Sequence, residues 1–355
     1  MLNRGVVIYM IIVDKEEIMT NDNITLYLEK LGVMEKICNA NTILIKPNFI
    51  YGSYAKADSH IVTNISFLRE IVKFLLSLNQ KALIYIAESD NIGYEFAYLK
   101  FENLKLPQIL NLNFDEFNRV QLLDLSRDRL IRIQNILFKY FNSVDRQLWI
   151  SEKLFNSDII ISLSNLKTHT NTGYSGACKN LFGCLPAFDK SYYHPDIHKV
   201  IHDLTLAIKP HINIVDAFYA MEKNGPINGV AINCGFRILS EDAVEADFAA
   251  LSLVGLKPMK IKYLKYLSRK NKNKNYKDVC YPSIIRIKKP SLFVTCMNKI
   301  GLTIQKFGAI IEKYGNDLHT CTAPIEVIAM TLRPLLLRFI DIETLKKIKK
   351  SIMTK

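Results

Sequence analysis

The chain has 355 residues, of which 49% are hydrophobic, and it carries a formal net charge of +13. This length suffices for one large domain or two smaller ones, and the sequence has no run of about 18 apolar residues, which excludes a membrane-spanning helix. The seven cysteines include no C-x-x-C pair, a pattern typical of reduced cytosolic thiols, and this argues against a self-contained ferredoxin module with a 4Fe-4S cluster.

The first part of the chain predicts a strand followed by a β-α-β unit. The apolar stretch at residues 5–13 lacks a small-residue cleavage site, so a first strand is favoured over a signal peptide and we expect a cytoplasmic protein. Apolar residues 43–45 predict the next strand. Thr63 is the expected N-cap of a helix whose apolar side chains recur at helical spacing up to Leu75, and residues 82–87 predict the following strand.

Residues 91–150 mix short segments and predict an insertion or subsidiary layer. Further strands are expected at residues 158–163, 212–215 and 236–239, with helices over about 196–208 and 242–254. Ser240 is the expected cap of the last helix, and Gly255 its C-terminal stop. The predicted fold class is α/β, with a mostly parallel sheet flanked by helices and a basic helical C-terminal extension.

The C-terminal region differs from the rest of the chain in charge. Residues 257–355 hold 22 Lys and Arg against 6 Asp and Glu, whereas residues 1–256 hold 25 against 28. We therefore predict an α/β domain over residues 1–256 and a basic, largely helical region over 257–355, with terminal helices at 325–340 and 342–352. The charge suggests docking to an acidic protein or an anionic membrane surface, and a solvated basic face on helices that cover the sheet explains it equally well. Nucleic acid is not favoured, because no reading motif accompanies the charge.

Polar or charged residues follow each of the five later strands. In an open parallel sheet the ligand crevice lies outside the carboxyl ends of the strands, so these side chains are expected to meet at one edge. They are Lys46 and Asn48, Glu88 and Asp90, Asn165, Lys167 and His169, Asp216, and Asp242.

The densest polar group lies between residues 165 and 183, where two lysines, a histidine, amides and glycines occur close together. Repeated glycines let backbone N–H groups approach an anion, and lysine ammonium groups supply charge. Lys167, Lys179 and Asn180 are therefore candidate ligands of a phosphate or carboxylate, together with Lys46 and Asn48. The segment does not match a P-loop or a dinucleotide-binding fingerprint.

Three histidines occur at a spacing of four, at positions 194, 198 and 202. His198 and His202 could share a metal on one helix face, although exposed helix histidines are the simpler interpretation. His194 and His169 are the candidates for acid–base chemistry, with Asp216 orienting a base or binding a cation.

Several carboxylates and thiols are weaker metal candidates. Glu88 and Asp90 could ligate a divalent cation. Asp247 lies in an apolar helix pattern and requires a buried partner, for which a lysine is one choice. Cys178 and Cys184 could contribute to a metal site, but small core residues explain them more simply. The sequence identifies no cofactor.

Taken in order, the motifs resemble the uncharacterised family called domain of unknown function 362, over about residues 40–256. The resemblance rests on Ile45 to Asn48, Glu88-Ser89, Asn165 to His169, Lys179 to Gly183, His194, Val215 to Ala217, Gly225-Pro226 and Ser240 to Asp247. Relatives often carry a fused ferredoxin module, whose clustered cysteines this chain lacks.

The resemblance implies that one site contains Lys46, Asn48, Lys167, His169, Lys179, Asn180, His194 and Asp216. It brings no settled reaction, although oxidoreduction is one class that it suggests. We therefore expect an enzyme acting on a small anionic substrate that bears phosphate or carboxylate groups. The alternative is a non-catalytic ligand-binding or redox-accessory protein, whose basic tail docks a membrane surface or an acidic partner.

Overall fold

The computed structural model describes residues 11–16, 20–50, 52, 55–56, 59–91, 96–187, 189–269 and 276–314. The chain divides into two units, Met1–Asn298 and Lys299–Lys355. The helices predicted at 325–340 and 342–352 lie outside the described residues, as does most of the predicted N-terminal strand. The predicted division of the chain at residue 256 stays a prediction.

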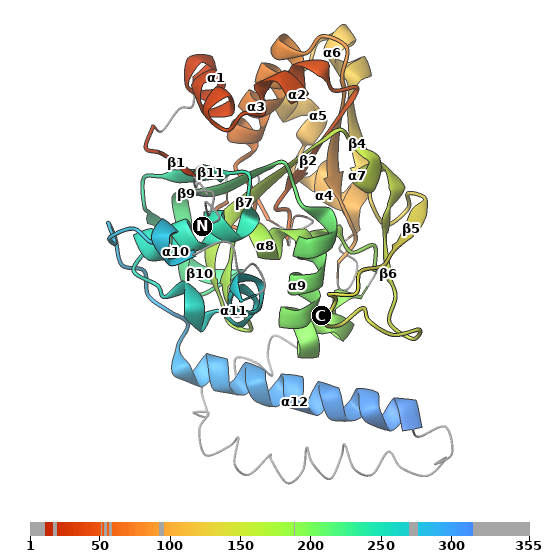
Figure 1. Cartoon of the computed structure of the whole chain (residues 1–355), viewed down its shortest axis with the longest axis vertical. Helices are drawn as coiled ribbons and strands as arrows, with labels where there is room; N and C mark the ends of the chain where they lie inside the picture. The colour runs from red at the N-terminus through yellow and green to blue at the C-terminus, as the bar shows by residue number, and fades with distance from the viewer. Residues whose placement is uncertain are drawn as a thin grey trace, which may run out of the picture. The chain divides into compact units, whose positions relative to one another are not determined.

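A mixed sheet forms the centre of the first unit (Figure 1). Its strand order is β1 (Ile11–Asp14), β11 (Arg237–Ser240), β9 (Ile212–Asn224), β7 (Ile159–His169), β2 (Thr42–Pro47), β3 (Leu83–Glu88) and β4 (Val120–Asp124). The five strands from β9 to β4 are parallel, whereas β11 is antiparallel to both β9 and β1. Two short strands extend this sheet by antiparallel pairing, β8 (Gly173–Ser175) with β7 and β10 (Asn228–Asn233) with β9. Strands β5 (Leu130–Ile133) and β6 (Leu148–Ser151) form a separate two-stranded sheet.

Helices connect and cover the strands. The α-helices are α1 (Asn21–Lys30), α2 (Met34–Asn39), α3 (Ile65–Leu78), α4 (Ala97–Asn103), α5 (Leu106–Leu110), α6 (Phe114–Arg119), α7 (Glu152–Asn156), α8 (Ala177–Asn180), α9 (Ile197–Ile208), α10 (Ala243–Leu253), α11 (Lys262–Ser268) and α12 (Leu292–Tyr314). Short 3₁₀ turns are η1 (Leu181–Cys184), η2 (Lys190–Asp196), η3 (Pro258–Lys260) and η4 (Tyr276–Val279).

The alternation of side chains along the strands creates two hydrophobic cores, one on each face of the sheet. On β2, Ile43 and Ile45 pack in a core that includes α3, whereas Leu44 packs in the core that includes α9 and α10. Successive side chains of a strand point to opposite faces, so a central strand that is covered by helices on both sides is apolar throughout. The predicted α/β fold with a mostly parallel, helix-flanked sheet is confirmed.

Several local predictions were wrong. Asn64 caps α3 with its side chain, and Thr63 instead accepts a hydrogen bond from the Asn48 amide at 2.8 Å. Asp242, not Ser240, caps α10. Because β11 is antiparallel, Asp242 lies at the opposite edge of the sheet from the ends of the parallel strands. Within residues 91–150, β4 joins the main sheet as a strand that the sequence pattern did not indicate.

Strands β7 and β9 are longer than predicted, and this lengthening shapes the site. Asn165, Lys167 and His169 lie within β7, and Asp216 lies within β9. The pairing of β7 with β9 shifts in register between Asn165 and Lys167. An irregularity of this kind re-aims side chains and is common next to functional sites.

Candidate functional site

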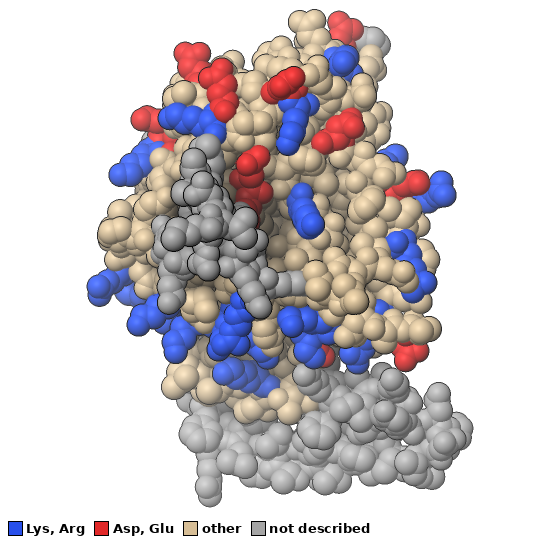
Figure 2. Space-filling view, in the orientation of Figure 1, with Lys and Arg blue, Asp and Glu red and all other residues tan. Residues whose placement is uncertain are grey.

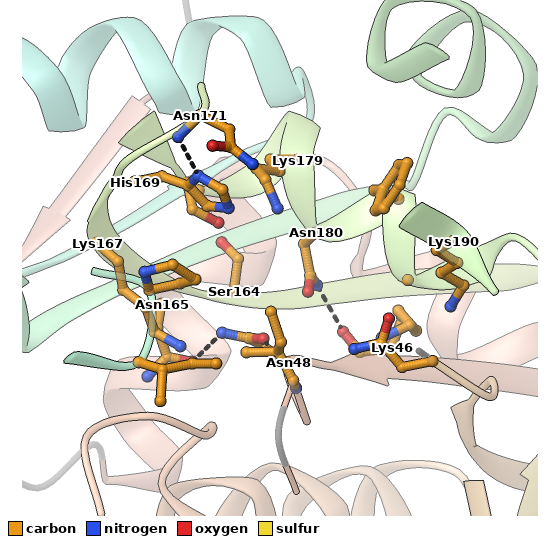
Figure 3. Close-up of a pocket in the computed structure, with 18 of the residues that line it drawn as sticks. Lys46, Asn48, Ser164, Asn165, Lys167, His169, Asn171, Lys179, Asn180 and Lys190 are labelled. Atoms are coloured by element: carbon orange, nitrogen blue, oxygen red, sulfur yellow. Dashed lines mark hydrogen bonds between the residues drawn. The ribbon is translucent and has the colours of Figure 1, made fainter. Parts of the chain in front are cut away.

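A cavity of about 320 Å³ lies where β2, β3 and β7 meet α4, α8 and η2 (Figure 3). Seven of its lining residues are among the predicted catalytic or ligand-binding residues, and Glu88 is among the weaker metal candidates. The seven are Lys46, Asn48, Lys167, His169, Lys179, Asn180 and His194. The structure therefore brings together side chains that are up to 148 positions apart in the sequence.

Lysines dominate the charge of the cavity. Five of them line it, and Glu88 is the one carboxylate among the described residues that do so. Each ammonium group belongs to a buried residue, with exposed fractions of only 0% to 8%; these are Lys46, Lys100, Lys167, Lys179 and Lys190. Burial of a charge without a partner is costly, so this excess of cations favours an anionic ligand.

Glu88 compensates one of the five lysines. Its Oε2 atom lies 3.1 Å from Nζ of Lys46, which also donates to the Pro47 carbonyl at 2.6 Å. Burial by itself would raise the pKa of Glu88, but Lys46, Lys100 and Lys190 hold it below its ordinary value. Gly183 leaves room for this pair, because a Cβ atom there would lie 2.9 Å from Nζ of Lys46.

Two further lysines converge on Ser89. Lys100 donates to the Ser89 carbonyl at 2.8 Å, and Lys190 donates to the Ser89 hydroxyl. Burial, followed by the charge of Lys100, lowers the pKa of Lys190 to about 7. Lys190 is therefore partly neutral near pH 7 while the cavity contains no anion.

Lys167 and Lys179 lie in another part of the cavity. Lys167 donates to the Ile61 carbonyl, and burial followed by the charge of Lys179 lowers its pKa to about 7. Burial lowers the pKa of Lys179 to about 8. Its Nζ atom lies 5.5 Å from the centre of the Phe182 ring, and no described residue accepts a hydrogen bond from it. Lys179 is therefore available to a ligand.

The two histidines of the cavity are neutral near pH 7. Nδ1 of His169 accepts hydrogen bonds from the backbone amides of Asn171 at 3.1 Å and Thr172 at 3.4 Å, so its proton resides on Nε2. Burial lowers the pKa of His169 well below its ordinary value, which makes it a fixed hydrogen-bond donor. His194 is stacked on Phe182 at 6.0 Å, and burial lowers its pKa to about 4.

The two asparagines of the predicted site hold the cavity wall together. Asn180 donates to the Lys46 carbonyl at 3.0 Å and to the Ser162 hydroxyl at 3.1 Å, which ties α8 to strands β2 and β7. Asn48 donates to the Asn165 side chain at 3.4 Å. Both residues remain part of the cavity lining.

Asp247 sets the position of the turn that carries Lys179 and Asn180. Its carboxylate accepts hydrogen bonds from the amides of Ala177 at 2.7 Å and Cys178 at 3.1 Å, and from the Tyr174 hydroxyl at 3.0 Å. The expected lysine partner is thus replaced by backbone amides. A Cβ atom on Gly176 would lie 2.4 Å from this carboxylate, so the turn requires glycine there.

The other predicted residues do not line the cavity. Asp216 is buried 3.4 Å from Arg237 on β11, and burial raises its pKa against the effect of that arginine. Asp90 pairs with Arg127 at 2.9 Å. Cys178 packs in a hydrophobic core, His198 is stacked on Tyr263, and His202 contacts Asp203.

The described residues contain no group of three or more His, Cys, Asp or Glu side chains placed to hold a metal ion. The sequence-based expectation of a divalent cation stays a prediction, as do the roles of the individual site residues.

Sequence reasoning missed Lys100 and Lys190. Neither follows a strand: Lys100 projects from α4 and Lys190 from η2. The one local signal was that Lys100 interrupts the apolar face of its helix, between the buried Ala97 and Phe101.

Comparison with known proteins agrees with the motif order. The sequence model of the family described as domain of unknown function (DUF362) matches residues 43–252. The chain belongs to this family. A relative of this DUF362 protein, the thylakoid-associated protein of Synechocystis sp., is 28% identical over 266 residues, which are 72% of this chain and 76% of that one.

A crystal structure of a protein from Thermotoga maritima aligns with 60% of this chain and 53% of that chain, at 13% identity and a TM-score of 0.33. That similarity is too low to support any argument. Within the described part of this DUF362 protein, no helix has both the length and the apolar character needed to cross a membrane.

The burial of Lys179 should lower the free energy of unfolding of the wild-type protein near pH 7. Its pKa is about 8 in the folded chain and 10.5 ordinarily, so the unfolded state binds more protons between these values and stability rises with pH there. We expect Lys179→Met to raise the free energy of unfolding by about 1–3 kcal/mol at pH 7, without multivalent anions, and the gain to shrink toward pH 10. Urea denaturation at both pH values measures it.

The control is Lys265→Met, which removes an exposed lysine of α11. It should change the free energy of unfolding by less than about 0.5 kcal/mol at either pH. A Lys179→Met variant that is less stable than the wild type, or whose advantage does not depend on pH, would contradict the assignment.

Proposed function

We propose that the protein is an enzyme acting on a small substrate that carries phosphate or carboxylate groups, and that the lysine-lined cavity is its active site. The observation that carries this proposal is the presence of five buried lysines and one glutamate around about 320 Å³ of space. Electrostatic groups held in a dry, fixed arrangement stabilise developing negative charge more strongly than the same groups in water.

The neighbouring groups suit proton transfer. A general acid or base acts best when its pKa lies near the working pH, and the pKa values of Lys167 and Lys190 are both about 7. His169 presents a fixed N–H donor that can polarise a carbonyl or hold an oxyanion. His194 lies at the cavity wall with a pKa of about 4, and an anionic substrate bound beside it would raise that pKa toward the working pH, so His194 is the candidate base.

The alternative is a binding or redox-accessory protein that uses the same cavity without turnover. Both roles need an anionic ligand. They differ in whether the protein converts the bound ligand by proton transfer or only holds it. An oxidoreductase is one reaction class within the proposal; the cofactor that it would need is not indicated by the described residues.

Anion binding should weaken as pH rises. Sulfate stays a dianion from pH 6 to 9, and its binding should raise the pKa values of Lys167, Lys179 and Lys190, which then take up protons. Each lysine that must take up a proton adds up to about a tenfold loss of affinity per pH unit above its pKa. Calorimetry should show an affinity at least about tenfold lower at pH 8.5 than at pH 6.5.

The variant Lys167→Met should reduce the affinity for sulfate and flatten its pH dependence, whereas the exposed-site control Lys265→Met should reproduce the wild type. Sulfate affinity that is independent of pH, or no binding at either pH, would remove the basis for an anion site.

The enzyme and the binding protein are distinguished at His194. A panel of phosphorylated and carboxylated metabolites is first screened for those that raise the melting temperature, and turnover of these is followed by mass spectrometry. We expect His194→Asn to lower turnover by about 10²–10⁴-fold while affinity changes little, because a positioned acid or base contributes about that factor.

The matched control is His211→Asn. His211 lies outside the cavity, and its Nδ1 accepts a hydrogen bond from the Ile160 amide, a role that the asparagine oxygen can take over. Stabilising metabolites that the wild type never converts would favour the binding protein over the enzyme.

We propose, as a second role, peripheral attachment to an anionic membrane surface through residues 257–355. One relative is named a thylakoid-associated protein, and this region holds the excess of basic residues. Figure 2 shows Lys and Arg side chains gathering over the lower part of the first unit, whereas Asp and Glu lie mainly toward the top. Lys257, Lys260, Lys262 and Lys265 are exposed.

Flotation with phosphatidylcholine vesicles, with or without phosphatidylglycerol, tests this second role. The full chain should float with the anionic vesicles at low salt, and a variant with Lys346, Lys347, Lys349 and Lys350 changed to Gln should float less, because each lysine near an anionic surface contributes about 1 kcal/mol. The control changes four exposed lysines of the first unit to Gln, namely Lys30, Lys36, Lys81 and Lys105. Equal flotation of all three proteins would eliminate the proposed contribution of these tail lysines.

A further inference from the structure

The cations of the cavity form two separate groups, which we term the first and second poles. The first pole comprises Lys167 and Lys179 with the neutral histidines His169 and His194, and the second comprises Lys46, Lys100, Lys190 and Glu88. In Figure 3, Lys167 and His169 lie toward one end of the cavity with Lys179 beside His169, Lys46 and Lys190 lie toward the other end, and Asn48 and Asn180 lie between the ends.

The register of the sheet explains this separation. Lys46 on β2 is paired with Ser162 on β7, and Lys167 lies five residues farther along β7. At about 3.3 Å per residue, the two backbone positions are offset by roughly 16 Å along the strands. Their ammonium groups are also held by different partners, Glu88 for Lys46 and the Ile61 carbonyl for Lys167.

The charges of each pole act mainly on members of the same pole. After burial, the pKa of Lys167 is lowered by Lys179, whereas that of Lys190 is lowered by Lys100 and Lys46. With all lysines protonated, each pole carries a formal charge of +2, because Glu88 cancels one of the three lysines of the second pole. The amides between the poles carry no net charge.

The first pole also contains an unused acceptor. Oδ1 of Asn171 is buried without a hydrogen-bond partner, and Asn171 lines the cavity next to His169. A buried acceptor without a partner is costly, so a ligand that donates a hydrogen bond at this position would be favoured.

We propose that the cavity selects an elongated small molecule with one phosphate or carboxylate group at each end, and with a hydroxyl or amine donor near the end that the first pole binds. This inference rests on the proposed function and narrows its substrate class. A ligand with a single anionic group would leave the other pole buried and uncompensated. A ligand with two such groups compensates both poles in one binding event.

Calorimetry on the full chain tests the proposal with sulfate and with alkane α,ω-bisphosphonates of increasing chain length, each compared with the monophosphonate of the same length. Sulfate should bind twice per chain. One bisphosphonate length should bind once per chain and about a hundredfold more tightly than its monophosphonate, because the second contact becomes intramolecular.

Variants at each pole complete the experiment. Lys179→Met and Lys190→Met should each weaken the best bisphosphonate by about tenfold or more and remove one of the two sulfate sites, whereas Lys265→Met should change neither. Retained binding of one sulfate in each variant also shows that the variants are folded.

Two results would overturn the two-pole inference. One is a single sulfate per chain whose affinity falls in both variants, and the other is a bisphosphonate series that never exceeds the monophosphonates. Either result leaves the proposed anion site intact. A wild-type protein that binds no sulfate would instead count against the proposed function itself.

Discussion

The desolvation of five ammonium groups around one carboxylate is the constraint on which this site depends. The chain provides Glu88 for Lys46, carbonyl or hydroxyl oxygens for Lys100, Lys167 and Lys190, and no described acceptor for Lys179. These contacts satisfy donors but leave an excess of positive charge in a buried space. Such an arrangement is unfavourable in the empty protein and becomes favourable with an anion, which links the stability of the fold to its ligand.

This arrangement depends on strand β7, which continues past its pairing with β2. Strand β7 extends to His169, shifts its register with β9 after Asn165 and pairs with the short strand β8. The chain then turns back through α8, where Asp247 fixes the amides of Ala177 and Cys178. Lys167 from β7 and Lys179 from α8 therefore line the same cavity.

Site residues could be predicted from the sequence where strand order places them, and could not be predicted where tertiary packing does. Lys46 and Asn48 lie at the end of β2, and the segment from Lys167 to Asn180 covers the end of the adjacent parallel strand β7 and the chain after it, so strand topology alone placed them together. Lys100 and Lys190 reach the cavity from helical segments, and the interrupted apolar face around Lys100 does not by itself indicate which cavity that helix packs against. Asp216 was assigned to the site because it follows an apolar run, but the antiparallel strand β11 brings Arg237 beside it.

The protonation of the cavity lysines is the property that reports most directly on whether the cavity is a desolvated cationic site. NMR titration of lysine side chains, assigned by single Lys→Arg variants, should find Lys167 and Lys190 titrating near pH 7 and Lys179 near pH 8 in the empty protein, with all three moving upward when sulfate is added. If all three titrate near the ordinary lysine value of about 10.4 in the empty protein and do not respond to sulfate, the cavity is not the desolvated cationic site described above.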